Sequence, residues 1–404
     1  MAKTILEGSL NDVDRAYAET KIVPTISLTE FYDSNVFIAP KGVDTGNIPW
    51  DLGTRLSSDV KITNTSRDID ASALVGVAGT TYVNNPDLTY VSTNGNVNAA
   101  LDGWVGRLVP GLKLQISDVF QYTPEMPAFL PGGRLATDSD IFARGIQATR
   151  ANTFTNTASV TGAYGLTPSL GLAGAYSYSM FTVGTLYVPP SNQFAQTFAD
   201  TKYHSFSVGP TLQLTRSETL SLNYQGILMN LTAPGLQQRF EAHGGAIEYS
   251  KETPDWYARI SGGATVVTQG TGAFFTGRAT LVGKFDPLTK VTMVVSRAIA
   301  PAFFGSPGAM ISTSASVFLS KELTRLLTLT ASGNFALNES VPTEGLAKYE
   351  TYTASMILKY NFTRNLFTEL TYNYINATFG GELITPPTLL ERSLVGLSIN
   401  MTWN

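Results

Sequence analysis

The sequence has no cysteine, only two histidines and few charged residues, 14% of its 404. Without cysteine there can be no disulfide, thiol nucleophile, haem-attachment CxxCH motif or cysteine zinc site. Globular chains usually carry about 25% charged residues, and uncharged polar residues replace them here. No apolar run approaches the 18 residues that a transmembrane helix needs. The net charge of −4, without a basic stripe, argues against nucleic-acid binding.

What the sequence does contain is alternation, clearest at its C-terminus. Every second residue from Val395 to Trp403 is apolar, and the residues between are small and polar. This period of two is typical of a β-strand with one apolar face. A soluble sandwich usually carries Lys and Glu on its outer face. The small, uncharged polar faces of this chain therefore favour another β architecture.

The same pattern predicts about eighteen strands along the chain. Their connections alternate between short turns and longer segments, of which 123–146 is the longest. The strands are predicted at 21–36, 52–63, 67–80, 88–102, 110–122, 147–163, 168–180, 201–214, 218–229, 237–250, 255–267, 273–285, 289–298, 309–320, 325–337, 348–362, 365–376 and 391–403.

An even number of such strands, with short turns on one side and long loops on the other, is typical of an outer-membrane β-barrel. The sequence thus predicts an all-β fold: a transmembrane antiparallel β-barrel over residues 21–404, with short periplasmic turns and long extracellular loops. Residues 1–20 are predicted to form a periplasmic arm or a plug without a strand. A soluble propeller or β-helix is the alternative, but neither predicts two alternating classes of loop.

The stretch from Pro24 to Phe37, PTISLTEFYDSNVF, resembles the opening strand of a β-barrel porin family often associated with exopolysaccharide and exosortase gene clusters. The shared phrase covers Phe31, Tyr32, Asp33 and Asn35-Val36-Phe37. The resemblance implies an outer-membrane barrel, with polysaccharide export as one version of its function. The last strand also resembles the C-terminal signal read by the barrel-assembly machinery, with Trp403 as its aromatic residue, although Trp403 is penultimate and the chain ends on Asn404.

Motifs for catalysis are missing. No P-loop, HExxH, GxSxG or EF-hand pattern occurs, so we expect no catalytic residue, metal or cofactor. By strand parity His204 shares the face of Phe206 and Val208, which favours a structural, interfacial role. His243 shares a face with Arg239 and Glu241 and is expected in the lumen.

The polar faces of the predicted strands carry charges that lipid would disfavour, so parity assigns them to an aqueous lumen. Either plain solvation or a selectivity role suits these residues, and their mixed signs predict weak ion discrimination. The predicted lumen set is Arg55, Asp59, Lys61, Arg239, Glu241, His243, Arg259, Arg278 and Lys359.

Loop 123–146 is expected either to fold inward and narrow the bore or to remain a solvated surface loop. In the first case its acidic pair, Asp138 and Asp140, would meet a basic wall formed by Arg239, Arg259 and Arg278. Its charged residues are Glu125, Arg134, Asp138, Asp140 and Arg144.

These observations predict a porin-like channel for small hydrophilic solutes, or for polysaccharide, in the bacterial outer membrane. No secretory signal is recognisable at the start of the sequence, so we expect that a signal was removed or that the protein is cytosolic; the barrel favours the former. Expected partners are outer-membrane lipid and the barrel-assembly machinery, with a homo-oligomer or a protein partner also compatible. The rival function is a non-transporting barrel that sheathes a partner, such as a multihaem cytochrome, or acts as a surface adhesin.

Overall fold

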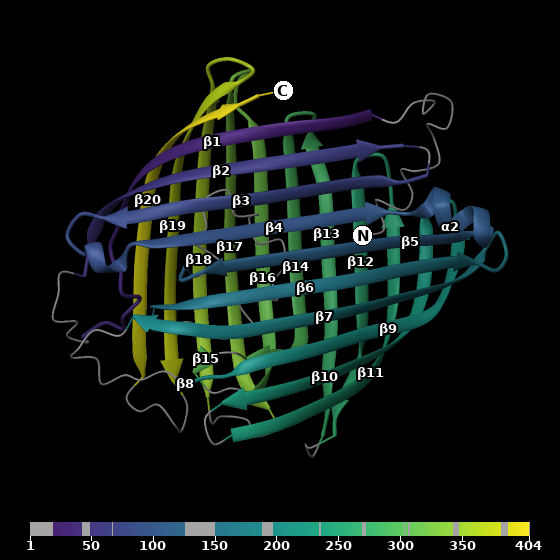
Figure 1. Cartoon of the computed structure of the whole chain (residues 1–404). Coiled ribbons are helices and arrows are strands. Elements are labelled where there is room, and N and C mark those ends of the chain that lie inside the picture. Colours follow the sequence, from purple (N-terminus) through teal and green to yellow (C-terminus); the bar gives the residue numbers. More distant parts are fainter. Residues whose placement is uncertain are drawn as a thin grey trace.

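The computed structural model describes residues 19–42, 49–66, 68–125, 150–187, 197–233, 236–268, 272–302, 304–305, 308–341, 347–380 and 387–403. Within these ranges, eighteen antiparallel strands form one sheet, each strand pairing with its neighbours in the chain (Figure 1). The barrel strands are β1 (Glu19–Asp33), β2 (Asp51–Thr65), β3 (Asp70–Tyr82), β4 (Tyr90–Ala100), β5 (Leu112–Thr123), β6 (Arg150–Gly165), β7 (Leu170–Tyr187), β9 (Asp200–Thr215), β10 (Glu218–Ala233), β11 (Leu236–Glu252), β12 (Trp256–Val267), β13 (Ala273–Asp286), β14 (Thr289–Ala302), β16 (Gly308–Glu322), β17 (Leu327–Val341), β18 (Lys348–Asn361), β19 (Leu366–Gly380) and β20 (Thr388–Thr402).

The sheet closes because the first and last strands pair. β1 and β20 are antiparallel from the Thr25–Thr402 pair to the Asp33–Leu394 pair. Closure leaves no strand edge without a partner, which is the condition for a sheet to cross hydrocarbon. The structure confirms the predicted fold class, a closed transmembrane antiparallel barrel of eighteen strands.

The predicted strand boundaries differ from the structure mainly at the long-loop end. Four strands, β10, β14, β17 and β19, each run four residues further than expected, and β7 runs seven further. A two-stranded sheet of β8 (Thr197–Phe198) and β15 (Phe304–Gly305) also joins two of the long connections. At the other end, the predicted turn between β4 and β5 contains a helix, α2 (Asp102–Leu108). β1 begins at Glu19, two residues inside the predicted arm, and residues 1–18 lie outside the described ranges.

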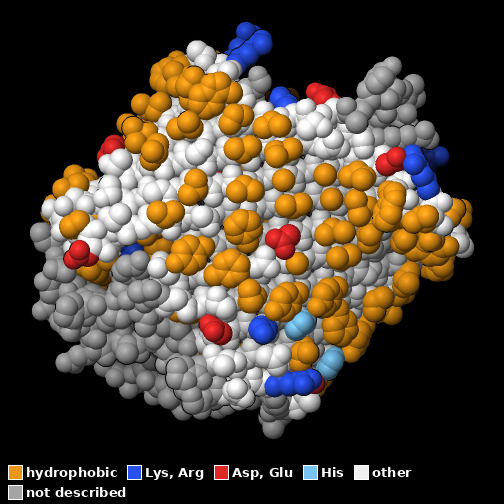
Figure 2. All heavy atoms as spheres, viewed as in Figure 1, with side chains coloured by type: hydrophobic (Ala, Val, Ile, Leu, Met, Phe, Trp, Pro, Cys, Tyr) orange, Lys and Arg blue, Asp and Glu red, His pale blue; other side chains and the backbone are white. Residues whose placement is uncertain are grey.

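The two faces of the wall differ as the alternation predicts. Ile399 is 57% exposed on the outside of β20, whereas its neighbour Ser398 is 6% exposed on the inside. Large apolar side chains cover the outer wall in Figure 2. This surface suits contact with hydrocarbon. In the part of the chain that the structure describes, no helix combines the length and hydropathy needed to span a membrane.

Apolar side chains are buried at the long-loop end, where two clusters form. One is built on β1, β3, β4, β16 and β18–β20 and includes Tyr349, Phe379 and Leu390. The other joins β10, β11, β12, β14, β16 and β17 and includes Met229 and Phe240. Side chains from both halves of the barrel are thus packed at this end.

Candidate functional site at the long-loop end of the lumen

The chain folds into the barrel immediately after β1. Residues 34–42 leave the strand, and Val36, Phe37 and Ile38 are almost completely buried. They belong to the same apolar cluster as Tyr82 on β3 and Tyr349 on β18. We call residues 34–39 the inward segment, because it packs against the inner faces of strands on both sides of β1.

A side-chain clamp fixes the shape of the inward segment. The Asn35 side chain donates to the Ala39 carbonyl at 2.8 Å and accepts from the Ala39 amide at 3.0 Å. It also donates to the Glu391 carbonyl of β20 at 3.1 Å. Inside this turn Ile38 has a φ of 56°, which is rare for a β-branched residue and costs on the order of 1–3 kcal/mol. The surrounding contacts must therefore hold the segment in place.

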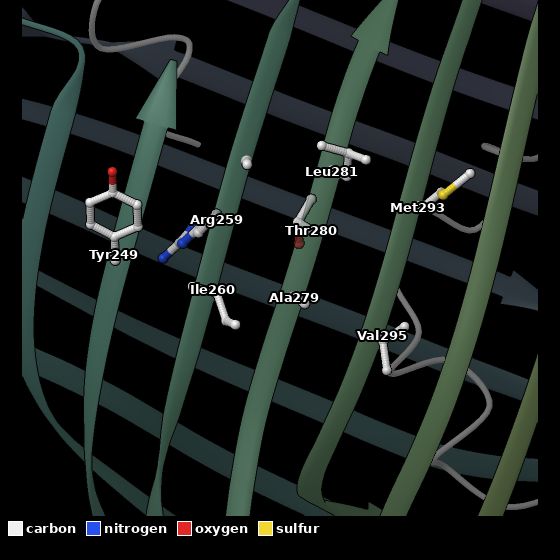
Figure 3. A pocket seen from close by; sticks show the side chains of 9 residues that line it. Tyr249, Arg259, Ile260, Ala279, Thr280, Leu281, Met293 and Val295 are labelled. Carbon is white, nitrogen blue, oxygen red and sulfur yellow. The ribbon is translucent and has the colours of Figure 1, made fainter. Parts of the chain in front are cut away.

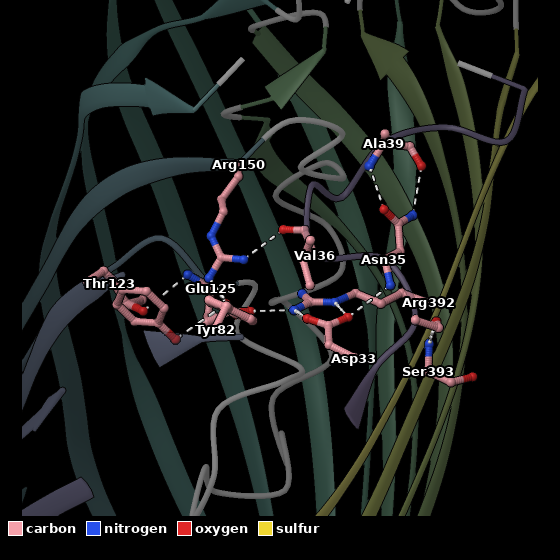
Figure 4. Close-up of polar contacts among 12 residues, drawn as sticks. Asp33, Asn35, Val36, Ala39, Tyr82, Thr123, Glu125, Arg150, Arg392 and Ser393 are labelled. Atoms are coloured by element: carbon pink, nitrogen blue, oxygen red, sulfur yellow. Dashed lines mark hydrogen bonds and ion pairs between the residues drawn. The ribbon is translucent and has the colours of Figure 1, made fainter. Parts of the chain in front are cut away.

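Four buried ionised groups lie beside the inward segment (Figure 4). Arg392 of β20 binds Asp33 through two hydrogen bonds, at 2.9 and 2.5 Å, and Glu125 through one at 2.9 Å. Arg150, at the start of β6, pairs with the other oxygen of Glu125. We call these four residues the ion cluster. It links the barrel closure to the beginning of the long connection after β5.

Arg150 connects the ion cluster to the inward segment. Its Nη1 donates to the Val36 carbonyl at 2.7 Å, and its Nη2 donates to the Tyr82 hydroxyl at 2.9 Å. The guanidinium carbon also lies 5.1 Å from the ring centres of Tyr82 and Tyr90, within the range of cation–π attraction. The cation thus contacts backbone, carboxylate and aromatic rings at once.

The electrostatics keep Glu125 ionised. Burial alone would raise the pKa of this carboxyl, but the guanidiniums of Arg150 and Arg392 lower the pKa to about 2. Both arginines are fully buried, so the loss of Glu125 would leave Asp33 as the one carboxylate of the ion cluster against two buried cations. Breaking one partner of a buried ion pair typically costs about 3–5 kcal/mol.

A small cavity of about 20 Å³ lies on the lumen side of the ion cluster. Glu125, Arg55, Tyr82 and Tyr90 line it, together with Phe31. Its volume suits about one water molecule. The described side chains around the ion cluster therefore pack with little space between them.

Away from the mouth, uncharged polar side chains meet across strands of the inner wall. Ser117 and Ser159 are 2.6 Å apart, and Thr157 and Ser179 are 2.9 Å apart. On the opposite side, Ser355 donates to Asn373 at 2.7 Å. These groups are partly exposed and offer hydroxyl and amide hydrogen bonds without a fixed charge.

Six of the predicted lumen residues lie on the inner face. Arg55, Asp59 and Lys61 alternate on β2 with the outward Leu56, Val60 and Ile62. Three more come from the other half of the barrel. Arg259 pairs with Glu248 at 2.5 Å, Arg278 lies opposite Ser261, and Lys359 lies 3.6 Å from the ring centre of Phe367.

Three predicted lumen residues are placed on the outer face instead. Arg239, Glu241 and His243 share strand parity with Ile247, which is 60% exposed, while Phe240 and Ala242 between them are buried inside. They lie near the start of β11, at the long-loop end. Charges are much less costly there than at the bilayer centre, so the rule that charge points inward fails at this position. The basic wall predicted to include Arg239 is therefore wrong.

Both histidines lie on the outer face of the barrel. His204 shares its face with Phe206 and Val208, as predicted, and its Nδ1 lies 2.8 Å from the Tyr176 hydroxyl. His243 makes the same contact with Tyr224, also at 2.8 Å. Tyrosine at such a level is typical of the aromatic girdles of barrels. Both histidines thus belong to the outer wall.

Of the predicted constriction-loop residues, only Glu125 is described. Both of its carboxylate oxygens form ion pairs within the ion cluster, one with Arg150 and the other with Arg392. Arg134, Asp138, Asp140 and Arg144 lie outside the described residues, so their role stays a prediction. Trp403 is described: its backbone N–H donates to the Pro24 carbonyl at 3.1 Å. Its role as an assembly signal is likewise untested.

Sequence reasoning missed Asp33, Arg150 and Arg392 as site residues. Asp33 and Arg392 are 359 positions apart, so no local spacing could have paired them. One signal was present: the phrase from Phe31 to Phe37 covers Asp33 and Asn35, which anchor the inward segment. The described residues contain no group of three metal-binding side chains.

No family model and no curated protein match this chain. Among solved structures, the siderophore receptor PirA from Pseudomonas aeruginosa has a TM-score of 0.41 at 10% identity, covering 94% of this chain and 80% of the receptor. OccAB3 from Acinetobacter baumannii has a TM-score of 0.41 at 10% identity, covering 95% and 99%. OpdQ from Pseudomonas aeruginosa has a TM-score of 0.41 at 9% identity, covering 95% and 97%.

Proposed function

We propose that this protein is a bacterial outer-membrane channel for small hydrophilic, hydroxyl-rich solutes, with its long-loop mouth narrowed by the inward segment. The observation that carries the proposal is an apolar outer wall around an interior whose partly exposed groups are hydroxyls and amides, such as Ser117, Ser159 and Asn373. Such groups hydrogen-bond sugars without favouring either ion sign. The few inward charges have both signs, which predicts weak charge selectivity.

Polysaccharide export is a finer version of the same proposal. The phrase at Phe31–Phe37 supports it by resemblance, and the hydroxyl and amide interior is chemically compatible with a sugar chain. A chain of sugars would have to pass the ion cluster and the inward segment, so export would require this barrier to open.

Liposome swelling in isotonic, uncharged sugars tests the proposal. Asp33→Asn combined with Arg392→Gln removes one charge of each sign and leaves the Glu125–Arg150 pair intact. We expect slow swelling that falls steeply with sugar size in the wild type, and faster swelling in the double variant. If neither protein admits any sugar or ion, the channel function is wrong, and the non-transporting scaffold or adhesin replaces it.

A further inference from the structure

The outer wall carries a carboxylate halfway along a strand. Asp118 lies six residues after the start of β5 and five before its end. On the same face its neighbours are Val97 on β4, which is 48% exposed, and Ile116 on β5, which is 39% exposed. Figure 2 shows an acidic side chain surrounded by apolar ones on this wall. In a bilayer this position faces hydrocarbon.

Hydrocarbon cannot satisfy this group. A carboxylate can accept about four hydrogen bonds, and lipid tails donate none. In the structure Asp118 accepts from one side chain, the Asn156 amide on β6, whose Nδ2 lies 3.1 and 3.3 Å from its two oxygens. A lipid headgroup would have to descend half the wall to reach it. An ionisable side chain at membrane depth is by default a functional site.

The outer wall on β11–β14 differs from the region around Asp118. There the outward side chains form a groove of about 320 Å³ on the outer surface (Figure 3). Ala258, Ala279, Ile260, Leu281 and Met293 are among the residues that line it. A lipid chain satisfies such a surface completely. The region around Asp118 differs because a lipid chain offers its polar pair no further hydrogen bond.

We propose that the β4–β6 wall is a symmetric interface between two copies of this chain. A carboxylate beside an amide is self-complementary: across a twofold axis, the second N–H of each Asn156 amide, whose contact with the Val119 carbonyl is long at 3.5 Å, would donate to the Asp118 carboxylate of the other copy. Twofold contacts of this kind are the commonest in homo-oligomers. Ala158, directly opposite Asp118, has only a methyl group and leaves room for close approach. The proposal rests on the barrel lying in a bilayer, not on what the lumen transports.

Disulfide trapping tests this interface, and the cysteine-free sequence provides a clean background. Ala158→Cys is purified, reconstituted into phospholipid vesicles and oxidised, so that only a second copy of the chain is available. We expect a covalent dimer. The matched control is Ala279→Cys, which places the thiol in the lining of the apolar groove and should trap little dimer.

The role of the polar pair is tested by adding Asp118→Leu to Ala158→Cys. Because lipid offers no hydrophobic drive for association between membrane segments, loss of the hydrogen bonds should lower the trapped fraction severalfold. Heat-modifiable mobility on gels shows that each barrel is folded. Trapping at position 158 no greater than at 279, or unchanged by Asp118→Leu, overturns the proposal. Neither outcome depends on conductance, so it is independent of the channel test.

Discussion

Among single residues, Glu125 is a buried carboxylate that contacts both arginines of the ion cluster. It pairs with two fully buried arginines and, together with Asp33, balances their charge, so we expect Glu125→Gln to lower the free energy of unfolding by about 3–5 kcal/mol. Urea unfolding in detergent micelles measures the change. The control is Asp68→Asn, which breaks the exposed 2.5 Å pair with Arg107 and should cost less than about 1 kcal/mol. Similar losses at both positions would show that burial does not set the strength of the cluster.

The pKa of Glu125 also predicts an acid response. Because the folded state lowers the pKa from 4.5 to about 2, its stabilisation is fully present above pH 4.5 and is lost as the pH falls through about 2. We therefore expect the closed mouth to persist when the pH is lowered from 7 to 4. Single-channel conductance recorded between pH 7 and pH 4 checks this expectation. A rise in conductance between pH 7 and pH 5 would point to another titrating group.

The assignment of side chains to the outer and inner faces of the barrel wall leads to a third prediction. Ile399→Arg places a cation against hydrocarbon and should cost about 2–4 kcal/mol if it lies near the bilayer midplane. Val119 is the matched control, because it is also apolar and 39% exposed but lies on the inner face. Val119→Arg should cost far less in the same equilibrium unfolding measurement. Equal costs would contradict the assignment of the two faces.

At the scale of elements, the Asn35 clamp should decide whether the inward segment stays in place. Asn35→Ala removes both hydrogen bonds to Ala39 and the bond to β20, so the segment should loosen and single-channel conductance should rise. Asn84→Ala is the control, since the Asn84 side chain binds Asp51 outside this segment. Unchanged conductance in Asn35→Ala would show that other contacts hold the segment.

Comparison of the predicted and observed strands shows which features of the fold depend on local sequence signals. The strands could be predicted because period-two alternation and turn length are local signals. The faces of β2, β12 and β20 followed from parity, but β11 was assigned incorrectly at Arg239, Glu241 and His243. There the charges lie at the end of the outer wall, and the exposed Ile247 further along the strand carried the correct parity.

At the scale of the whole molecule, closure of the barrel brings together residues that the sequence separates. Asp33 and Arg392 meet because β1 pairs with β20, and Glu125 and Arg150 join them from either end of one long connection. No spacing rule predicts such a cluster, because its geometry exists only after the sheet has closed. The barrel was therefore predictable from sequence, whereas the ion cluster at its long-loop end was not.

We infer that the inward segment narrows a channel that would otherwise be open. The direct test is single-channel conductance in planar bilayers, comparing the wild type with a variant in which Asn-Gly replaces residues 34–50. This two-residue turn suits the observed pairing of Asp33 with Asp51. We predict a small conductance for the wild type and a severalfold larger one for the variant. A folded variant that conducts no better than the wild type would contradict the account.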